Sequence, residues 1–159
     1  MKNLWAPWRF KYITQQRKDK GCLFCRVSKE NKDKENLIVY RKERSFVILN
    51  LYPYNSGHIM ISPYVHVNSI ETLEKEDRDE LFETVANACI NIRKEMSAEG
   101  FNIGINIGTV AGAGVAEHVH IHVVPRWGGD TNFMPLISDI KVVSEALEDT
   151  YYRLKKYRY

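Results

Sequence analysis

The sequence predicts an α+β protein in which two main helices cover an antiparallel sheet of about five strands. Two observations indicate this class. Short runs of β-branched and aromatic residues follow one another through turns of few residues, which favours antiparallel pairing. Two longer segments instead carry the i, i+4, i+7 apolar spacing of amphipathic helices. A chain of 159 residues fits a single core, so we expect residues 1–159 to form one domain.

The expected strands are short segments bounded by turn residues. Their ranges are 36–40, 45–50, 58–62, 102–107 and 118–124. Charged residues form the turn between the first two, and a cluster of Tyr, Pro, Asn and Gly precedes the third. Pro63 and Pro125 are expected to end the third and the last strand, since proline has no N–H to donate to a ladder.

The longer helix is expected over residues 75–99. Acidic residues crowd its first turns, and Gly100 stands where a C-cap is expected. Cys89 lies on the apolar face of this helix and is interpreted as a core residue. That face is made of Leu81, Phe82, Val85, Ala88, Cys89, Ile92 and Met96. A second amphipathic helix is expected over about 140–156.

The composition excludes several classes of protein. With 44% hydrophobic and 27% charged residues the chain is globular rather than disordered. It has no run of eighteen apolar residues, so no membrane span is expected, and its start lacks the apolar stretch of a signal peptide. Three cysteines make no disulfide framework and indicate a reducing compartment, so we expect a cytoplasmic protein. The basic ends could attract polyphosphate or nucleic acid, but solvated termini are favoured.

Three histidines alternate with β-branched residues in the segment His118-Val119-His120-Ile121-His122. On a strand, alternate side chains share a face, which would space the three rings about 6.6 Å apart. Such a row is costly to bury unless each ring has a partner. It suits either chelation of a metal together with a further ligand, or attack on phosphorus by one imidazole whose tautomer its neighbours fix. A purely structural cluster is the third interpretation.

A glycine-rich loop comes directly before these histidines. Gly108, Gly112 and Gly114 leave backbone N–H groups that can approach a phosphate and donate to it. The loop is not a Walker loop, because neither the Gly-Lys-Ser/Thr sequence nor a helix follows. A simple turn would explain the glycines alone, but beside three histidines the loop favours phosphate chemistry.

Cys22 and Cys25 form a Cys-x-x-Cys pair within a polar, Lys-rich stretch, 14–35, which we expect to be a loop around the pair. This spacing is half of a zinc site. A redox pair is the alternative, although no thioredoxin-like βαβ pattern surrounds it, and two free surface thiols are a third interpretation. His66 and His118 are candidates for the missing ligands.

The segment 118–124 matches the His-φ-His-φ-His-φ-φ pattern of the histidine-triad (HIT) family at every position, where φ is apolar. Residues 45–50, Pro53 and 57–63 resemble the nucleoside-binding strands of that family. Residues 125–135 and 4–9 are similar to a branch that contains diadenosine tetraphosphate phosphorylases and hydrolases. The resemblance implies a HIT-like domain with a basic, aromatic N-terminal segment, a C-terminal helix and assembly as a homodimer.

The resemblance also implies a role for each site residue. His120 would be the nucleophile that forms a nucleotidyl-histidine intermediate. His122 would hold the His120 ring through the backbone and contact phosphate oxygens, and His58 would lie beside the α-phosphate. Asn50 would contact the ribose and Asn106 the leaving group. Asn50 is equally well explained as a turn residue, and His58 could be a structural histidine.

The resemblance extends to the metal. Bacterial HIT proteins and galactose-1-phosphate uridylyltransferases are similar in combining Cys-x-x-Cys, a histidine after a proline-containing turn and the first triad histidine. It implies one structural zinc per chain, held by Cys22, Cys25, His66 and His118.

One departure from the family pattern bears on the leaving group. Many members carry an amide and a hydroxyl side chain shortly before the triad, whereas residues 113–117 here have neither. Thr109 could substitute, and the backbone amide of Gly114 or Val115 could stabilise phosphoryl oxygens.

The predicted function is cleavage of an adenine dinucleoside polyphosphate at the α-phosphate, with water or inorganic phosphate as acceptor. A nucleoside phosphoramidase and a nucleotide-binding signalling module with weak turnover are the alternatives. A nucleic-acid end-processing enzyme is less favoured, because no nucleic-acid module is attached. Arg126 is a candidate for holding the acceptor phosphate, with a strand-end salt bridge as the competing interpretation. The aromatic residues of the N-terminus could pack on the sheet or on a partner subunit, or stack on a second adenine.

Overall fold

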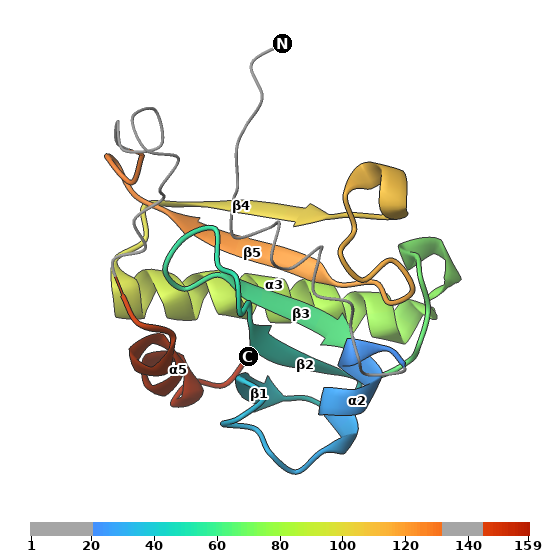
Figure 1. Cartoon of the computed structure of the whole chain (residues 1–159). Helices are drawn as coiled ribbons and strands as arrows, with labels where there is room; N and C mark the ends of the chain where they lie inside the picture. The colour runs from blue at the N-terminus through green and yellow to red at the C-terminus, as the bar shows by residue number, and fades with distance from the viewer. Residues whose placement is uncertain (1–20, 132–144) are drawn as a thin grey trace.

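The computed structural model describes residues 21–131 and 145–159. Within this part of the chain, five strands form one sheet in the order β1-β2-β3-β5-β4, and all neighbours are antiparallel (Figure 1). The strands are β1 (Ile38–Arg41), β2 (Ser45–Leu49), β3 (Ile59–Pro63), β4 (Gly100–Ile105) and β5 (Ile121–Arg126). The predicted fold class is confirmed, with strand bounds that differ from the expected ones by up to three residues.

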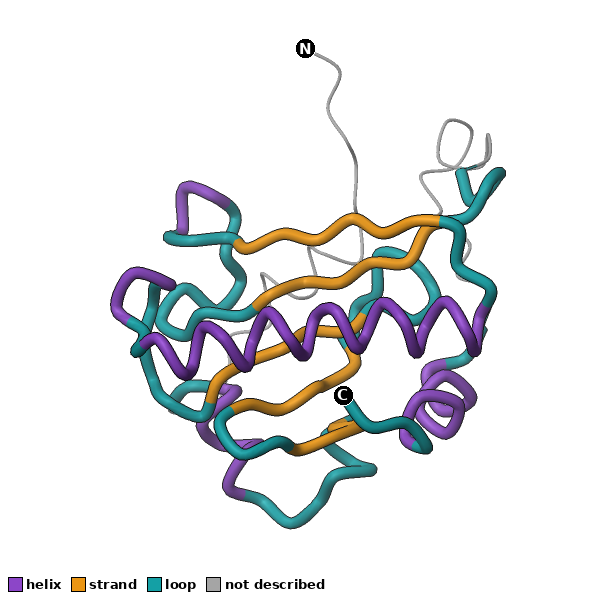
Figure 2. Tube along the Cα trace, turned by 180° about the vertical axis from the view of Figure 1, so that it is seen from behind, coloured by secondary structure: helices purple, strands orange, loops and turns teal. Residues whose placement is uncertain are grey.

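One face of the sheet is covered by α3 (Lys75–Met96), which in Figure 2 lies in front of the sheet and runs roughly along the strands. Leu81, Val85, Ala88 and Ile92 of this helix are buried against apolar residues of the sheet. The C-terminal helix α5 (Leu147–Lys155) joins the same core through Tyr151 and Leu154. The main core therefore lies between the sheet and these two helices. Residues 140–144 of the expected second helix, like the aromatic N-terminus, lie outside the described residues.

The opposite face of the sheet is covered in part by a short helix, α2 (Leu23–Lys29). Phe24 and Val27 are buried there against Phe46, Met60 and neighbouring residues. The expectation of a loop in this stretch was wrong. Seven residues with a single i, i+3 apolar pair are too few to give a periodic signal, and packing against the sheet stabilises the helix instead.

The alternation expected around the histidines is confirmed, although β5 begins only at Ile121. Val119, Ile121 and Val123 are buried in the core beneath α3. His122 pairs with Met60, which belongs to the smaller cluster on the other face. The even-numbered residues of this segment therefore share the face that carries α2.

Three details of the long helix differ from expectation. The helix ends at Met96, and Ser97 takes the left-handed conformation (φ 53°) that was expected of Gly100, which instead begins β4. Phe82 does not face the core, because its side chain is 57% exposed. Cys89 packs against the core and is half-buried.

Pro63 and Pro125 lie within β3 and β5 rather than after them, paired with Ser45 and Phe101. The carbonyl of Pro63 accepts a bond from His118, and that of Pro125 accepts one from Asn55. In a strand, a residue's N–H and C=O point to the same side. Each proline nitrogen therefore points to the side where β3 and β5 are no longer paired, so the missing N–H removes no ladder hydrogen bond. No described helix is long and apolar enough to cross a membrane.

Candidate functional site

The face of the sheet that carries α2 brings four histidines together. His58 precedes β3, His122 lies in β5, and His118 and His120 lie just before β5. His58, His118 and His120 are each less than 5% exposed. The rings of His120 and His122 are 4.9 Å apart between centroids, and those of His58 and His122 are 5.2 Å apart. The site is thus a continuous row of imidazoles rather than isolated surface groups.

His120 is held in one tautomer. Its Nδ1 lies 2.8 Å from the backbone carbonyl oxygen of His118. Since a carbonyl only accepts, Nδ1 carries the proton and Nε2 has a free lone pair. The carbonyl belongs to His118, which corrects the expectation that His122 would hold this ring. Phe24 of α2 packs on the His120 ring at 4.8 Å between centroids, and burial lowers the pKa of His120.

His122 and His58 form a second ordered unit. The backbone N–H of Tyr54 donates to His58 Nδ1 (3.1 Å), so the proton of neutral His58 is on Nε2. That nitrogen lies 3.0 Å from His122 Nδ1 and donates to it, which leaves the proton of His122 on its own Nε2. Burial, and then the neighbouring His120, lowers the pKa of His122 to about 4. At neutral pH His122 is therefore an uncharged donor.

The remaining polar residues predicted for the site lie around this row. Asn50 accepts a bond from the N–H of Tyr52 (2.9 Å), which makes it a turn residue, and its amide nitrogen lies 3.5 Å from His58 Nε2. Asn106 is half-buried and follows β4, whose last paired residue, Ile105, lies opposite Ile121. The register of the sheet thus carries Asn106 toward His120.

The glycine-rich loop adopts the conformations that require glycine. Gly108 (φ 81°) and Gly112 (φ 86°) flank a short 3-10 helix, η2 (Thr109–Ala111). Gly114 is exposed, whereas Val115 is buried in the cluster that contains Phe24. The end of the loop is therefore anchored beneath α2, next to the packing partner of His120.

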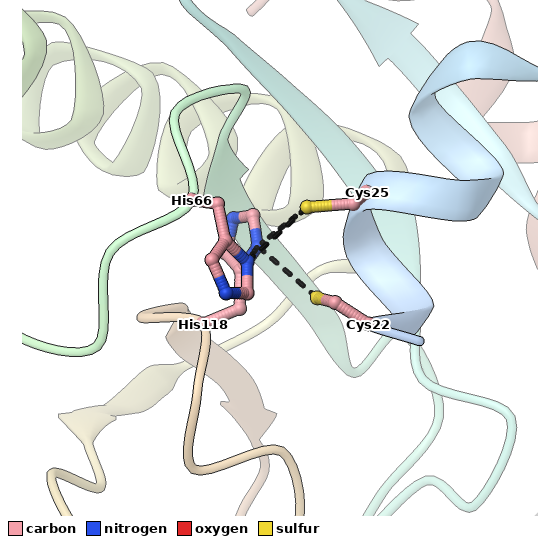
Figure 3. A group of neighbouring side chains, drawn as sticks. All are labelled: Cys22, Cys25, His66 and His118. Atoms are coloured by element: carbon pink, nitrogen blue, oxygen red, sulfur yellow. Dashed lines mark hydrogen bonds between the residues drawn. The ribbon is translucent and has the colours of Figure 1, made fainter. Parts of the chain in front are cut away.

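A second group of side chains lies at the other end of the histidine row. Cys22 and Cys25 at the start of α2 face His66 and His118, and the four donor atoms lie within 4.8 Å of one another (Figure 3). His118 Nδ1 is 3.3 Å from Cys22 Sγ and 3.3 Å from His66 Nδ1. Cys25 Sγ is 3.2 Å from His66 Nδ1. The predicted set of metal ligands is brought together as expected, and the cluster can bind a metal ion.

The tautomer of His118 fits this use. Its Nε2 donates to the carbonyl of Pro63 at 2.9 Å, so its Nδ1 has no proton and points its lone pair into the cluster. Burial lowers the pKa of His118, which keeps the ring neutral. Burial, and then the adjacent Cys22, raises the pKa of the Cys25 thiol. Two sulfur atoms and an unprotonated nitrogen directed at one point are the donor chemistry of a structural cation site.

Two interpretations of Arg126 were open, a group that holds the acceptor phosphate and a salt bridge at the end of the strand. Its Nε and Nη2 donate to the two carboxylate oxygens of Asp130 at 2.6 and 2.8 Å. Its Nη1 donates to Asn102 at 2.7 Å. The alternative, a salt bridge at the end of the strand, is confirmed. In this arrangement Nε, Nη1 and Nη2 all donate to acceptors within the protein.

Sequence reasoning missed Phe24, Tyr54 and Asn55. Phe24 had no signal beyond its place between two cysteines, and Tyr54 and Asn55 belong to a turn whose composition is ordinary. Only their contacts with the histidine row identify them.

An antiparallel sheet that carries alternating histidines beside a glycine-rich loop is the architecture of histidine-triad proteins. The chain belongs to this family, because the HIT domain model matches residues 31–129. It is 39% identical over 158 residues to a Mycobacterium tuberculosis protein named AP-4-A phosphorylase, covering 94% of this chain and 80% of that one. A Schizosaccharomyces pombe bis(5'-nucleosyl)-tetraphosphatase (asymmetrical) is 36% identical over 93 residues, covering 58% of this chain and 50% of that one.

Among solved structures, a zinc-bound histidine triad family protein from Mycobacterium smegmatis has a TM-score of 0.68 to this chain at 24% identity, covering 85% of this chain and 91% of that one. At this identity the likeness concerns the fold alone.

Proposed function

We propose that the protein cleaves dinucleoside polyphosphates of the diadenosine tetraphosphate type through a nucleotidyl-histidine intermediate on His120. The observation that carries this proposal is the 2.8 Å hydrogen bond from His120 Nδ1 to the His118 carbonyl, which leaves Nε2 free to attack. Homology to an AP-4-A phosphorylase and to a bis(5'-nucleosyl)-tetraphosphatase supports the substrate class.

The reaction would proceed in two displacements. Nε2 of His120 attacks the α-phosphorus, a P–N bond forms, and the bond to the bridging oxygen breaks, so the second nucleotide leaves with the remaining phosphates. An acceptor, either water or inorganic phosphate, then attacks the same phosphorus. The P–N bond breaks, the acceptor's proton passes to solvent, and the lone pair returns to Nε2. Dividing one displacement into two easier steps is the gain from a covalent nucleophile.

His122 supports both steps as a neutral donor. Its Nδ1 accepts from His58, so its Nε2–H is available to an oxygen of the α-phosphate. A donor that is in place before the reaction stabilises the charge that develops on that oxygen. Asn50, whose amide nitrogen lies 3.5 Å from His58 Nε2, would contact the ribose, and Asn106, which follows β4, would contact the leaving group.

The glycine-rich loop supplies donors from the backbone. Residues 113–117 carry no side-chain hydroxyl, so assistance to the leaving group falls to the N–H groups of Gly114 and Val115. The N–H of Gly112 already donates to the carbonyl of Thr109 (3.0 Å) and holds the loop in shape. Diadenosine tetraphosphate suits such a site, because its departing product is a nucleoside polyphosphate, a far better leaving group than an alkoxide.

We favour inorganic phosphate as acceptor, because the relative that matches 94% of the chain is named a phosphorylase. The test is incubation with diadenosine tetraphosphate with and without radiolabelled inorganic phosphate. Phosphorolysis gives ADP plus ATP, with the label in ADP, whereas asymmetrical hydrolysis gives AMP plus ATP. Unlabelled ADP, or a rate that does not depend on phosphate, would contradict phosphorolysis. Failure to cleave the dinucleotide under either condition would contradict the proposed function.

We further propose that Cys22, Cys25, His66 and His118 hold one zinc ion. Tetrahedral zinc, with Zn–N near 2.05 Å and Zn–S near 2.3 Å, separates two ligand nitrogens by about 3.3 Å and a nitrogen from a sulfur by about 3.5 Å. The corresponding distances here are 3.3 Å and 3.2–3.5 Å. Zinc with four protein ligands has no open position, so it would supply structure rather than a reactive water. Cysteines used as metal ligands rather than in disulfides are more typical of reducing compartments, which supports a cytoplasmic location.

A homodimer is the assembly that the exposed apolar residues support. β4 is an edge strand, and its Ile103 is 49% exposed. Arg93 lies over the Phe101 ring at 5.2 Å, which places that side of α3 beside β4. One turn away, Ile90 is 59% exposed. A second copy of the chain that pairs along β4 would satisfy the free edge and cover these side chains together.

A further inference from the structure

The segment that follows β5 contains an acidic residue, Asp130, that accepts hydrogen bonds from several donors. Asp130 accepts from Arg126 through both carboxylate oxygens, from the N–H of Trp127 (3.1 Å) and from the side-chain amide of Asn55 (2.8 Å). The Asp130 side chain is only 9% exposed. Arg126 and Asp130 are thus a fixed pair, and the bond from Asn55 links this pair to the turn before β3, 75 residues away in the sequence.

Asn55 is buried, with 6% of its surface exposed. Its two amide hydrogens go to Asp130 Oδ2 at 2.8 Å and to the carbonyl of Pro125 at 3.1 Å. Both partners only accept, so the orientation of this amide is determined by its environment. Asn55 therefore connects its turn to the end of β5 through two hydrogen bonds, of which the one to Pro125 is buried.

That turn contains the groups that orient the histidines. The N–H of His58 donates to the carbonyl of Asn55 (3.2 Å), and the N–H of Tyr54 donates to His58 Nδ1. Gly57 has φ 75°, and a Cβ added there would lie 2.8 Å from Met96 Sδ and 3.2 Å from Pro125. Close packing at Gly57 and the hydrogen bonds of Asn55 thus both hold the turn against Pro125, near the end of β5.

We propose that Asn55, held by the Arg126–Asp130 pair, is a positioning residue for the reaction. By fixing the turn it keeps the Tyr54 N–H on His58 Nδ1, which directs His58 Nε2–H to His122 and leaves the His122 Nε2–H for the substrate. This inference rests on the proposed function for its kinetic consequence. Its structural part is that Asn55 determines the tautomers of His58 and His122 from outside the histidine row. That part does not depend on which substrate the protein cleaves.

Two substitutions weaken the hydrogen bonds of Asn55 to Asp130 and Pro125 in different ways. Asn55→Ala deletes both donors. Asp130→Asn keeps the shape of the side chain but turns an NH2 group toward donors, since Arg126 and Asn55 both need an acceptor. The control is Glu95→Gln, which weakens the bonds of Glu95 to Lys156, Tyr157 and Arg153 at the end of α3 and so removes stabilising contacts outside the turn.

The first readout is the ring nitrogens of the histidines in the full-length, metal-loaded protein, observed by long-range ¹H–¹⁵N correlation at neutral pH. In the wild type we expect Nε2–H for His58 and His122 and Nδ1–H for His120. In Asn55→Ala and Asp130→Asn the first two should become tautomer mixtures while His120 is unchanged. Wild-type patterns for His58 and His122 in both folded variants would overturn the proposal.

The second readout is kinetic, with diadenosine tetraphosphate as substrate. Misplacement of a donor is expected to lower kcat by about 10- to 100-fold, with KM changed less than about threefold. Glu95→Gln should lose thermal stability yet keep the wild-type kcat and tautomers. Equal loss of kcat in Glu95→Gln would show that general destabilisation explains the effect. If the wild type does not cleave the dinucleotide, the proposed function fails, and the tautomer comparison alone decides the role of Asn55.

Discussion

The backbone carbonyl of His118 and the ring of His120 are joined by a 2.8 Å hydrogen bond, while the ring of His118 itself faces two cysteines. A single residue therefore belongs to both parts of the site. Its ring nitrogen Nδ1 lies in the metal cluster, its Nε2 is fixed on Pro63, and its main chain orients the neighbouring imidazole. The two parts are adjacent because side chains two residues apart on an extended segment point to the same face.

The first prediction concerns His120. His120→Ala should reduce turnover of diadenosine tetraphosphate by at least about 10³-fold, because the covalent route needs the Nε2 lone pair. Binding of adenine nucleotides, measured by calorimetry, should change little. Rapid quenching of the wild type with labelled substrate should trap a label on His120 that is stable in base and lost in acid. Turnover by the variant within tenfold of the wild type would contradict covalent catalysis.

The second prediction concerns the metal cluster. Protein purified without chelators should contain about one zinc per chain by elemental analysis. Cys25→Ser should lower both the zinc content and the Tm, the latter by at least about 5–10 °C, because metal binding is coupled to folding. Cys89→Ser is the matched control, since this thiol lies on α3 away from the cluster. Zinc-free protein with the Tm of the wild type would argue against a structural ion.

The third prediction concerns pH. Burial, and then His120, lowers the pKa of His122 to about 4, whereas an unfolded histidine titrates near 6.5. The unfolded chain thus binds one more proton between these values, and stability present above pH 6.5 is lost as the pH falls toward 4. Between pH 7 and 4.5 this group should cost on the order of 2 kcal/mol. Denaturant unfolding of the wild type and His122→Gln measures it, and equal pH dependence in the two proteins would be the contrary result.

The fourth prediction concerns assembly. Sedimentation equilibrium should show a dimer at micromolar concentration, and Ile103→Lys should shift it to monomer, because each copy would bring a charged side chain into the apolar contact. Tyr152→Lys changes an equally exposed residue on α5 and should remain dimeric. A monomeric wild type at tens of micromolar would contradict the proposed dimer.

The sequence predicted those features whose signal is local. Alternation of His118, His120 and His122 with β-branched residues placed three rings on one face, and this holds even though only the last lies within β5. The metal ligands were likewise recognisable, because few residue types bind zinc. The predicted strand ends were less accurate. Pro63 and Pro125 lie within their strands because the β3–β5 pairing has already ended at these positions.

Other features depend on contacts between distant segments and leave no local pattern. The α2 helix forms because Phe24 finds a surface on the sheet, and Asn55 matters because Asp130 lies across from it. Arg126 was ambiguous for the same reason. A guanidinium binds a carboxylate or a phosphate equally well, and only the folded chain shows which is present.

The separation of Cys22 from His118 has a consequence for how the chain matures. These ligands are 96 residues apart, and an ion between them would close nearly the whole sheet into one ring, comparable to a disulfide worth about 4–5 kcal/mol. During synthesis the cysteine pair emerges first and can hold an ion only loosely until the last strand arrives. The cross-link would therefore form at the end of folding, fastening an already assembled domain, and removing the ion would reopen that ring without breaking a covalent bond.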